Sequence, residues 1–105
     1  MSKAEPAAAF AALGDRTRLA LLVKLAGGAA LSIAALSADA GITRQAVTKH
    51  LRVLEDAGLV ASERAGRESR YTMHPDRIAT MRDYLGEVAA HWEEALARLK
   101  AFVED

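Results

Sequence analysis

Cysteine is absent from the 105-residue chain, which excludes disulfides, thiolate metal sites and redox sensing through cysteine. Nothing in the composition therefore indicates an oxidising compartment, and we expect a cytoplasmic protein. Aromatic side chains make up only 5% of the residues and proline occurs twice, whereas Ala, Leu, Glu and Arg are frequent. This composition favours a mainly helical domain over a β-sandwich.

Long apolar runs are also missing. No run reaches the ~20 residues that a helix needs to cross a bilayer, and the first ten residues lack the uninterrupted apolar stretch of a signal peptide. We expect a single domain over residues 1–105 with no membrane partner.

The formal net charge is zero, but the charges are unevenly distributed. Residues 44–82 carry eight basic and five acidic side chains, whereas residues 83–105 carry two basic and six acidic ones. A basic middle beside an acidic tail fits a surface that binds a polyanion. Charge that is merely scattered and solvated would give the same count, so this observation leaves both interpretations open.

Apolar spacing and capping residues predict five helices. The N-cap candidates are Asp15, Ser32 and Thr43, and glycines follow the expected ends. The expected helices are residues 6–13, 16–26, 33–40, 44–57 and 76–104. Two β segments, 59–64 and 68–73, flank a turn at Ala65-Gly66-Arg67 and predict a hairpin. The predicted fold is mainly α with a small β-hairpin wing, in the order α-α-α-α-β-β-α.

The helix expected at residues 44–57 has one apolar and one polar side. Val47, Leu51 and Leu54 share the side that should be buried. The opposite side contains no acid and consists of Arg44, Gln45, Thr48, Lys49 and Arg52. These side chains suit duplex DNA, because Gln pairs with adenine, Arg and Lys with guanine, and a Thr methyl with thymine. Every amphipathic helix has a polar side, however, and its cations often face only water.

The surroundings of this helix favour DNA binding. Only Gly41-Ile42-Thr43 separates it from the preceding helix, which makes the pair a helix-turn-helix candidate. The hairpin that follows carries Arg64, Arg67 and Arg70. We expect these arginines, with Thr43 and Arg44, to hold phosphates, since Glu63 and Glu68 dilute the positive charge of the wing.

Three segments resemble the ArsR/SmtB-type winged-helix repressors of bacteria. They read ALGDRTRL from residue 12, GITRQAVTKHLRVLEDAGLV from residue 41 and RAGRESRY from residue 64. The resemblance covers about residues 7 to 74, with Arg16 in place of a usual proline and Ser69 in place of a usual apolar strand residue. It implies a winged helix-turn-helix fold and a homodimeric repressor on an inverted-repeat operator.

The last predicted helix carries an apolar seam. Its residues alternate spacings of three and four over four heptads, as in a coiled coil. We expect a second copy to cover this seam, although packing within one subunit against Phe10, Leu13 and Leu22 is the alternative. The predicted dimer interface comprises Phe10, Leu13, Ile78, Met81, Leu85, Val88, Trp92, Leu99 and Phe102. A two-fold dimer would present two recognition helices about 34 Å apart, which predicts a pseudo-palindromic site.

No metal, cofactor or catalytic site is expected. The resembled family implies cysteine ligands near residues 31–37, which are absent, or a His-containing pattern on the last helix. His91 and Glu94 match half of that pattern, but Ile78 and Thr80 occupy the other positions, and zinc normally takes four ligands. No spacing typical of a catalytic triad or a phosphate-binding glycine loop occurs, so we expect no enzyme.

The sequence thus predicts a homodimeric repressor that binds double-stranded DNA, with Gln45, Thr48, Lys49 and Arg52 reading bases. The competing interpretation is a winged-helix module that binds a protein partner through its last helix or its wing. Salt dependence separates the two, because binding to DNA weakens steeply with salt.

Overall fold

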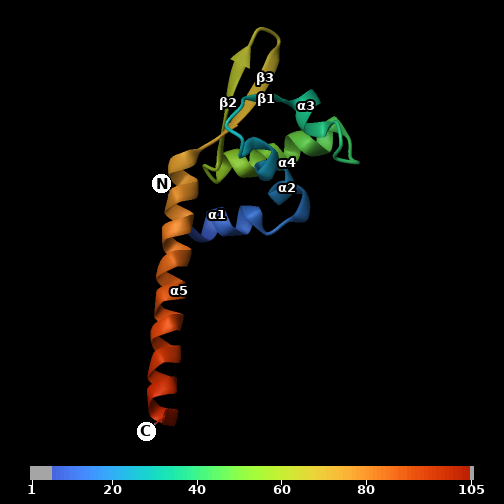
Figure 1. Ribbon diagram of the computed structural model, residues 1–105. Coiled ribbons are helices and arrows are strands. Elements are labelled where there is room, and N and C mark those ends of the chain that lie inside the picture. The colour runs from blue at the N-terminus through green and yellow to red at the C-terminus, as the bar shows by residue number, and fades with distance from the viewer. Residues whose placement is uncertain (1–5, 105) are drawn as a thin grey trace.

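The computed structural model describes residues 6–104, so residues 1–5 and 105 of the expected domain lie outside it. Figure 1 shows a small body from which one long helix projects. In chain order the elements are α1 (Pro6–Leu13), α2 (Arg16–Leu25), β1 (Leu31–Ser32), α3 (Ile33–Ser37), α4 (Arg44–Asp56), β2 (Val60–Ala65), β3 (Glu68–Met73) and α5 (Pro75–Glu104). The predicted winged helix-turn-helix is confirmed, with one strand more than expected.

Three helices begin at the residues predicted to cap them. The Asp15 carboxylate accepts from the backbone N–H groups of Thr17 and Arg18, at 2.9 and 3.0 Å. The Ser32 hydroxyl accepts from Ala35 N, and the Thr43 hydroxyl from Ala46 N. Each cap satisfies backbone donors that the first turn of a helix leaves without a partner.

The wing is a three-stranded antiparallel sheet in the order β1-β3-β2. The strand that was not predicted, β1, pairs Leu31 with Tyr71 and Ser32 with Arg70. Between β2 and β3 the turn is Gly66-Arg67, and Gly66 has φ +66°. A two-residue hairpin with its only positive φ at the first turn residue has the backbone of a type II′ turn, which strongly favours glycine there.

Helix α3 ends at Ser37, three residues before the predicted end at Ala40. The Ser37 hydroxyl donates to the carbonyls of Ile33 and Ala34, at 2.8 and 3.3 Å. Such bonds compete with continuation of the helix. The chain then turns through Gly41, at φ +72°, directly into the N-cap of α4.

The core lies between α2, α3, α4 and the start of the sheet. Its largest fully buried side chains are Leu21, Leu25, Leu36, Val47, Leu51, Leu54 and Leu59. The predicted buried side of α4 is therefore confirmed, since Val47, Leu51 and Leu54 are each 0% exposed. Because this side of α4 is buried in the core, the opposite, polar side of the helix faces outward.

Helix α5 gives the molecule its elongated shape, with extents of 67 × 30 × 22 Å. Its first turns pack on the body through Ile78 and the buried Met81, and Tyr84 meets Phe10 of α1 edge-on at 6.0 Å. Beyond them the helix runs free of the body (Figure 1). Within residues 6–104, none of the helices combines the length and apolar character needed to cross a membrane.

Candidate nucleic-acid interface

The outward side of α4 forms one wall of a groove. The groove has a volume of about 830 Å³ and lies between the start of α3, the outer side of α4 and the turn of the wing. Its lining includes all six residues predicted from the recognition segment: Thr43, Arg44, Gln45, Thr48, Lys49 and Arg52. The structure therefore gathers these side chains on one concave surface.

Two hydroxyls in the groove are already engaged by α4 itself. Thr43 caps the helix, and Thr48 Oγ1 donates to the Arg44 carbonyl at 2.8 Å. The Thr48 hydroxyl gives its hydrogen to this bond, so toward a ligand Thr48 can offer its methyl and the acceptor side of its hydroxyl. A methyl suits contact with the C5-methyl of thymine. Gln45, Lys49 and Arg52 are exposed, and their polar ends can form hydrogen bonds with a ligand in the groove.

The three wing arginines have different surroundings. Arg67, at the turn, lines the groove together with α4. Arg64 is exposed and pairs across the hairpin with Ser69, but it does not line the groove. Arg70 Nε donates to Glu68 Oε1 at 3.2 Å, so part of its charge is balanced within the wing. Of the three, Arg67 is the best placed to act together with α4.

Three residues at the start of α3, one on α4 and two on the wing also line the groove, and sequence reasoning missed them as site residues. They are Ser32, Ile33, Ala34, Ala46, Glu68 and Ser69. The pairing of β1 with β3 brings this part of α3 beside the wing. A strand of two residues has no periodicity, so the sequence carries no signal for that approach.

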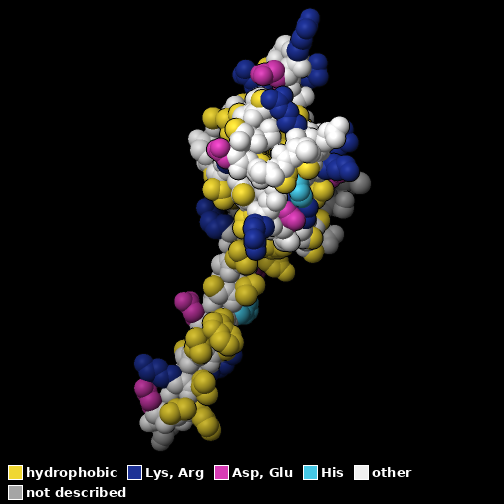
Figure 2. Space-filling view, turned by 90° about the vertical axis from the view of Figure 1, so that its right-hand side faces the viewer, with side chains coloured by type: hydrophobic (Ala, Val, Ile, Leu, Met, Phe, Trp, Pro, Cys, Tyr) yellow, Lys and Arg dark blue, Asp and Glu magenta, His cyan; other side chains and the backbone are white. Residues whose placement is uncertain are grey.

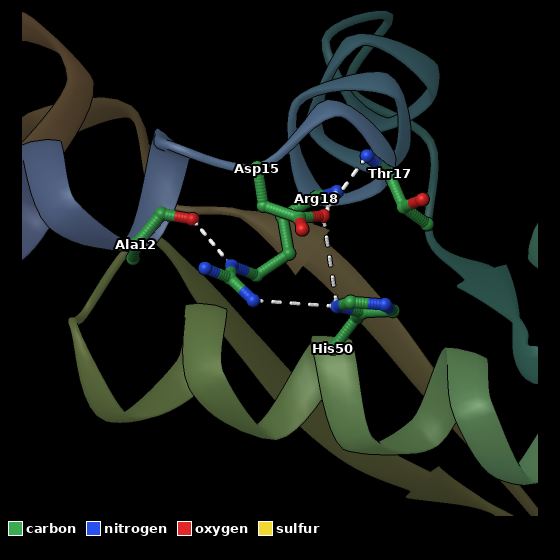
Figure 3. Close-up of polar contacts among 5 residues, drawn as sticks. All are labelled: Ala12, Asp15, Thr17, Arg18 and His50. Atoms are coloured by element: carbon green, nitrogen blue, oxygen red, sulfur yellow. Dashed lines mark hydrogen bonds and ion pairs between the residues drawn. The ribbon is translucent and has the colours of Figure 1, made fainter.

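Directional bonds hold α4 on two edges of its buried side. On one edge, Ser62 of β2 donates to Glu55 Oε2 at 2.8 Å. On the other, His50 Nδ1 lies 3.4 Å from Arg18 Nη1 and 3.9 Å from Asp15 Oδ2 (Figure 3). His50 is half-buried, and its Nδ1 meets the side chains of Arg18 and of the cap residue Asp15 rather than a backbone group.

Asp15 has a lowered pKa. The backbone N–H of Arg18, which donates to the carboxylate, is the main cause, and the nearby charge of Arg18 adds to it. Hydrogen bonds and cations favour the ionised form of a carboxyl group. Asp15 therefore caps α2 as a carboxylate at neutral pH.

Comparison with known proteins agrees with this geometry. A family model described as a helix-turn-helix domain matches residues 13–63. Over 91 residues the chain is 37% identical to the HTH-type transcriptional regulator Rv2034 of Mycobacterium tuberculosis, covering 87% of this chain and 81% of that protein. An ArsR-like transcriptional regulator from Rhodococcus sp. RHA1 has the same fold, with a TM-score of 0.78, 38% identity and coverage of 94% and 92%. The chain belongs to the ArsR/SmtB family of winged-helix transcriptional regulators.

A further structural relative of this ArsR/SmtB protein is a homodimeric winged helix-turn-helix DNA-binding domain from Mycobacterium bovis. Its TM-score is 0.65 at 25% identity, covering 84% of this chain and 82% of that one. The three relatives are described as regulators or DNA-binding domains, and none is described as an enzyme. The family assignment and the groove thus indicate a regulator that binds DNA.

The residues expected at the dimer interface of this ArsR/SmtB chain fall into two groups. Phe10, Leu13, Ile78 and Met81 pack against the subunit's own core, and Met81 is only 5% exposed, which leaves little of it for a partner. The others lie on the free part of α5 and are exposed: Leu85, Val88, Trp92, Leu99 and Phe102. The alternative that the whole seam packs within one subunit is therefore wrong.

The free part of α5 carries more apolar surface than the sequence analysis named. Leu96 and Val103 are 48% and 74% exposed. Together with the five exposed seam residues they form a continuous stripe, hereafter the α5 stripe, which Figure 2 shows as yellow side chains along the projecting helix. At the edge of the stripe His91 is exposed, as is Glu94. Across residues 6–104, no three His, Cys, Asp or Glu side chains of one subunit group as metal ligands would.

Acid should reveal the charge of the Asp15 cap. Because the folded-state pKa lies below the ordinary 3.8, the carboxylate stabilises the fold above pH 3.8, and this contribution is lost as the pH falls through the folded-state pKa. An asparagine in its place would still cap α2 but would not titrate. We expect the melting-temperature difference between parent and Asp15→Asn to shrink as the pH falls below about 4. A difference that stayed constant from about pH 6 to pH 2 would contradict the assignment.

Proposed function

We propose that this protein is a homodimeric transcriptional repressor that binds a pseudo-palindromic operator in double-stranded DNA in the cytoplasm. The groove carries the proposal. It brings the six recognition residues of α4 together with Arg67 of the wing. A helix in the major groove with a wing on the flanking backbone is the docking geometry that such a surface fits.

The roles follow from what each side chain offers. Gln45, Thr48, Lys49 and Arg52 read base edges, since they project from the outer side of α4. Arg44, Thr43 and Arg67 hold phosphates at the margins of the groove, and Arg64 and Arg70 add charge along the wing. Glu68 lines the groove near Arg67 and limits the net attraction there, which favours phosphate positioning over base reading by the wing.

The α5 stripe supports the homodimer. Its seven apolar side chains are each 48% to 81% exposed in the single subunit, and an apolar surface of this length is rarely left in water. The Mycobacterium bovis relative is a homodimer with the same fold. A two-fold axis along this stripe would present two α4 helices to successive major grooves on one face of a duplex. A dimer seated there represses by occluding a promoter.

Substitutions in α4 and in the wing should have different effects. We expect Gln45→Ala or Arg52→Ala to relax sequence preference by ~1 to 3 kcal/mol at the contacted base pair, because base contacts are lost. We expect Arg67→Ala to weaken binding to all sequences similarly and to lower the salt slope, because a phosphate contact is lost. Fluorescence anisotropy on matched and mismatched duplexes at several salt concentrations measures both effects.

Parent-like affinity and selectivity of all three variants would refute these roles. Salt-insensitive capture of a protein partner by a chain that binds no DNA would favour the interaction module instead.

A further inference from the structure

We propose that Arg18 and His50 are positioning residues for DNA binding, because their hydrogen bond fixes the rotation of α4 relative to α1 and α2. This inference rests on the proposed DNA-binding function. The bond joins Arg18 Nη1 to His50 Nδ1 at 3.4 Å, on one edge of the buried side of the recognition helix (Figure 3). Neither residue lines the groove, so neither is placed to touch DNA there.

The direction of the bond follows from its chemistry. A guanidinium only donates hydrogen bonds, so in this bond Nδ1 of His50 is the acceptor. Asp15 Oδ2 lies 3.9 Å from the same Nδ1, beyond hydrogen-bond reach, and its charge faces both Arg18 and His50. His50 thus receives one directional bond from a cation that a nearby carboxylate helps to hold in place.

Arg18 uses two edges of its guanidinium at once. While Nη1 meets His50 of α4, Nε donates to the Ala12 carbonyl in the last turn of α1. Only the planar fork of arginine makes both bonds from one rigid group. Arg18 therefore links the end of α1, the start of α2 and the side of α4.

Through this link, the orientation of α4 depends on α1 and, through α1, on α5, the helix of the proposed dimer interface. α1 packs on α5, where the Phe10 ring meets Tyr84 at 6.0 Å. A path of contacts then leads from α5 through α1 and Arg18 to His50. In a dimer held by α5, the two recognition helices would take their mutual orientation in part through this path, once in each subunit.

Apolar packing alone fixes rotation weakly, because it has no direction. Val47, Leu51 and Leu54 hold the middle of the buried side, whereas His50 and Glu55 hold its two edges. A rotation of α4 by about 10° would move a side-chain tip ~6 Å from the helix axis by about 1 Å. That shift is enough to spoil a hydrogen bond to a base edge. Loss of the Arg18–His50 hydrogen bond should therefore lower the affinity for the selected DNA sequence more than it lowers the stability of the fold.

The test uses the full chain and the tightest duplex selected from a random DNA library. We expect His50→Ala to bind this duplex about tenfold more weakly at a temperature where circular dichroism shows it fully folded. His50→Asn should recover most of the loss, because the amide oxygen can occupy the position of Nδ1 and accept from Arg18. Val53→Ala, a truncation to alanine at an exposed position on the same helix that does not line the groove, is the matched control and should bind like the parent.

A double-mutant cycle with Arg18→Lys tests whether His50 acts through Arg18. Lysine keeps the charge but cannot make both bonds, so the losses from Arg18→Lys and His50→Ala should not add. Parent-like affinity of folded His50→Ala would overturn the inference. A second pair of results would also overturn it: His50→Asn fails to restore the affinity that His50→Ala loses, and the losses from His50→Ala and Arg18→Lys add fully. His50 would then act without Arg18. Failure of the parent itself to select any duplex would instead refute the proposed function.

Discussion

Leu99→Glu should convert the proposed homodimer to a monomer and lower its affinity for a two-half-site duplex about a hundredfold or more. Leu99 lies in the α5 stripe and is 58% exposed in the single subunit, so the substitution should leave the subunit fold intact. In a two-fold interface each substitution appears twice, and two buried, unpaired carboxylates would face an apolar surface. Analytical ultracentrifugation measures the assembly and fluorescence anisotropy the affinity.

Ala101→Glu is the matched control for this prediction. It adds the same side chain two residues further along α5, at an exposed position outside the stripe. We expect this variant to remain dimeric and to bind like the parent. A dimeric Leu99→Glu variant, or a monomeric one with parental affinity for the two-half-site duplex, would contradict the role of the α5 stripe.

Leu51→Ala should lower the free energy of unfolding by about 2–5 kcal/mol. Leu51 is 0% exposed and lies in the buried middle of α4, so truncation leaves a cavity between α4 and the rest of the core. Because a domain of this size is stabilised by only about 5–15 kcal/mol, the variant should lose DNA binding at moderately raised temperature. Urea denaturation at a fixed protein concentration measures the change, since dimerisation couples stability to concentration.

Val53→Ala is the control on the same helix. Val53 is 39% exposed, and its truncation should change the free energy of unfolding by no more than about 0.5 kcal/mol. Equal costs for the two substitutions would mean that α4 does not bury the side assigned here, and the outward placement of Gln45 and Arg52 would fail with it.

The recognition helix could be predicted closely because its signals are local. Thr43 caps it, Gly58 at φ +79° follows its end, and Val47, Leu51 and Leu54 recur at helical spacing. These features act within one or two turns of chain, so the sequence displays them directly. The same holds for the hairpin, whose glycine turn lies between two β segments of six residues.

Features that depend on distant partners could not be predicted. Strand β1 exists only because Leu31 and Ser32 meet β3, nearly forty positions further along the chain. The apolar seam of α5 looks uniform in sequence, yet Met81 is buried against the core whereas Leu99 projects from it. Helical spacing places His50 at the edge of the buried side of α4. Its partners, Arg18 of α2 and the cap residue Asp15, could not be predicted, because helix packing brings them together.

Hydroxyl-radical and methylation footprinting of the parent on its selected duplex tests the central claim most directly, namely that paired subunits present two α4 helices side by side to one face of DNA. We predict two symmetry-related protected half-sites whose centres lie about one helical turn apart, with guanine N7 contacts in the major groove of each. Protection of one isolated half-site by a single subunit, or contacts confined to the minor groove, would contradict the account.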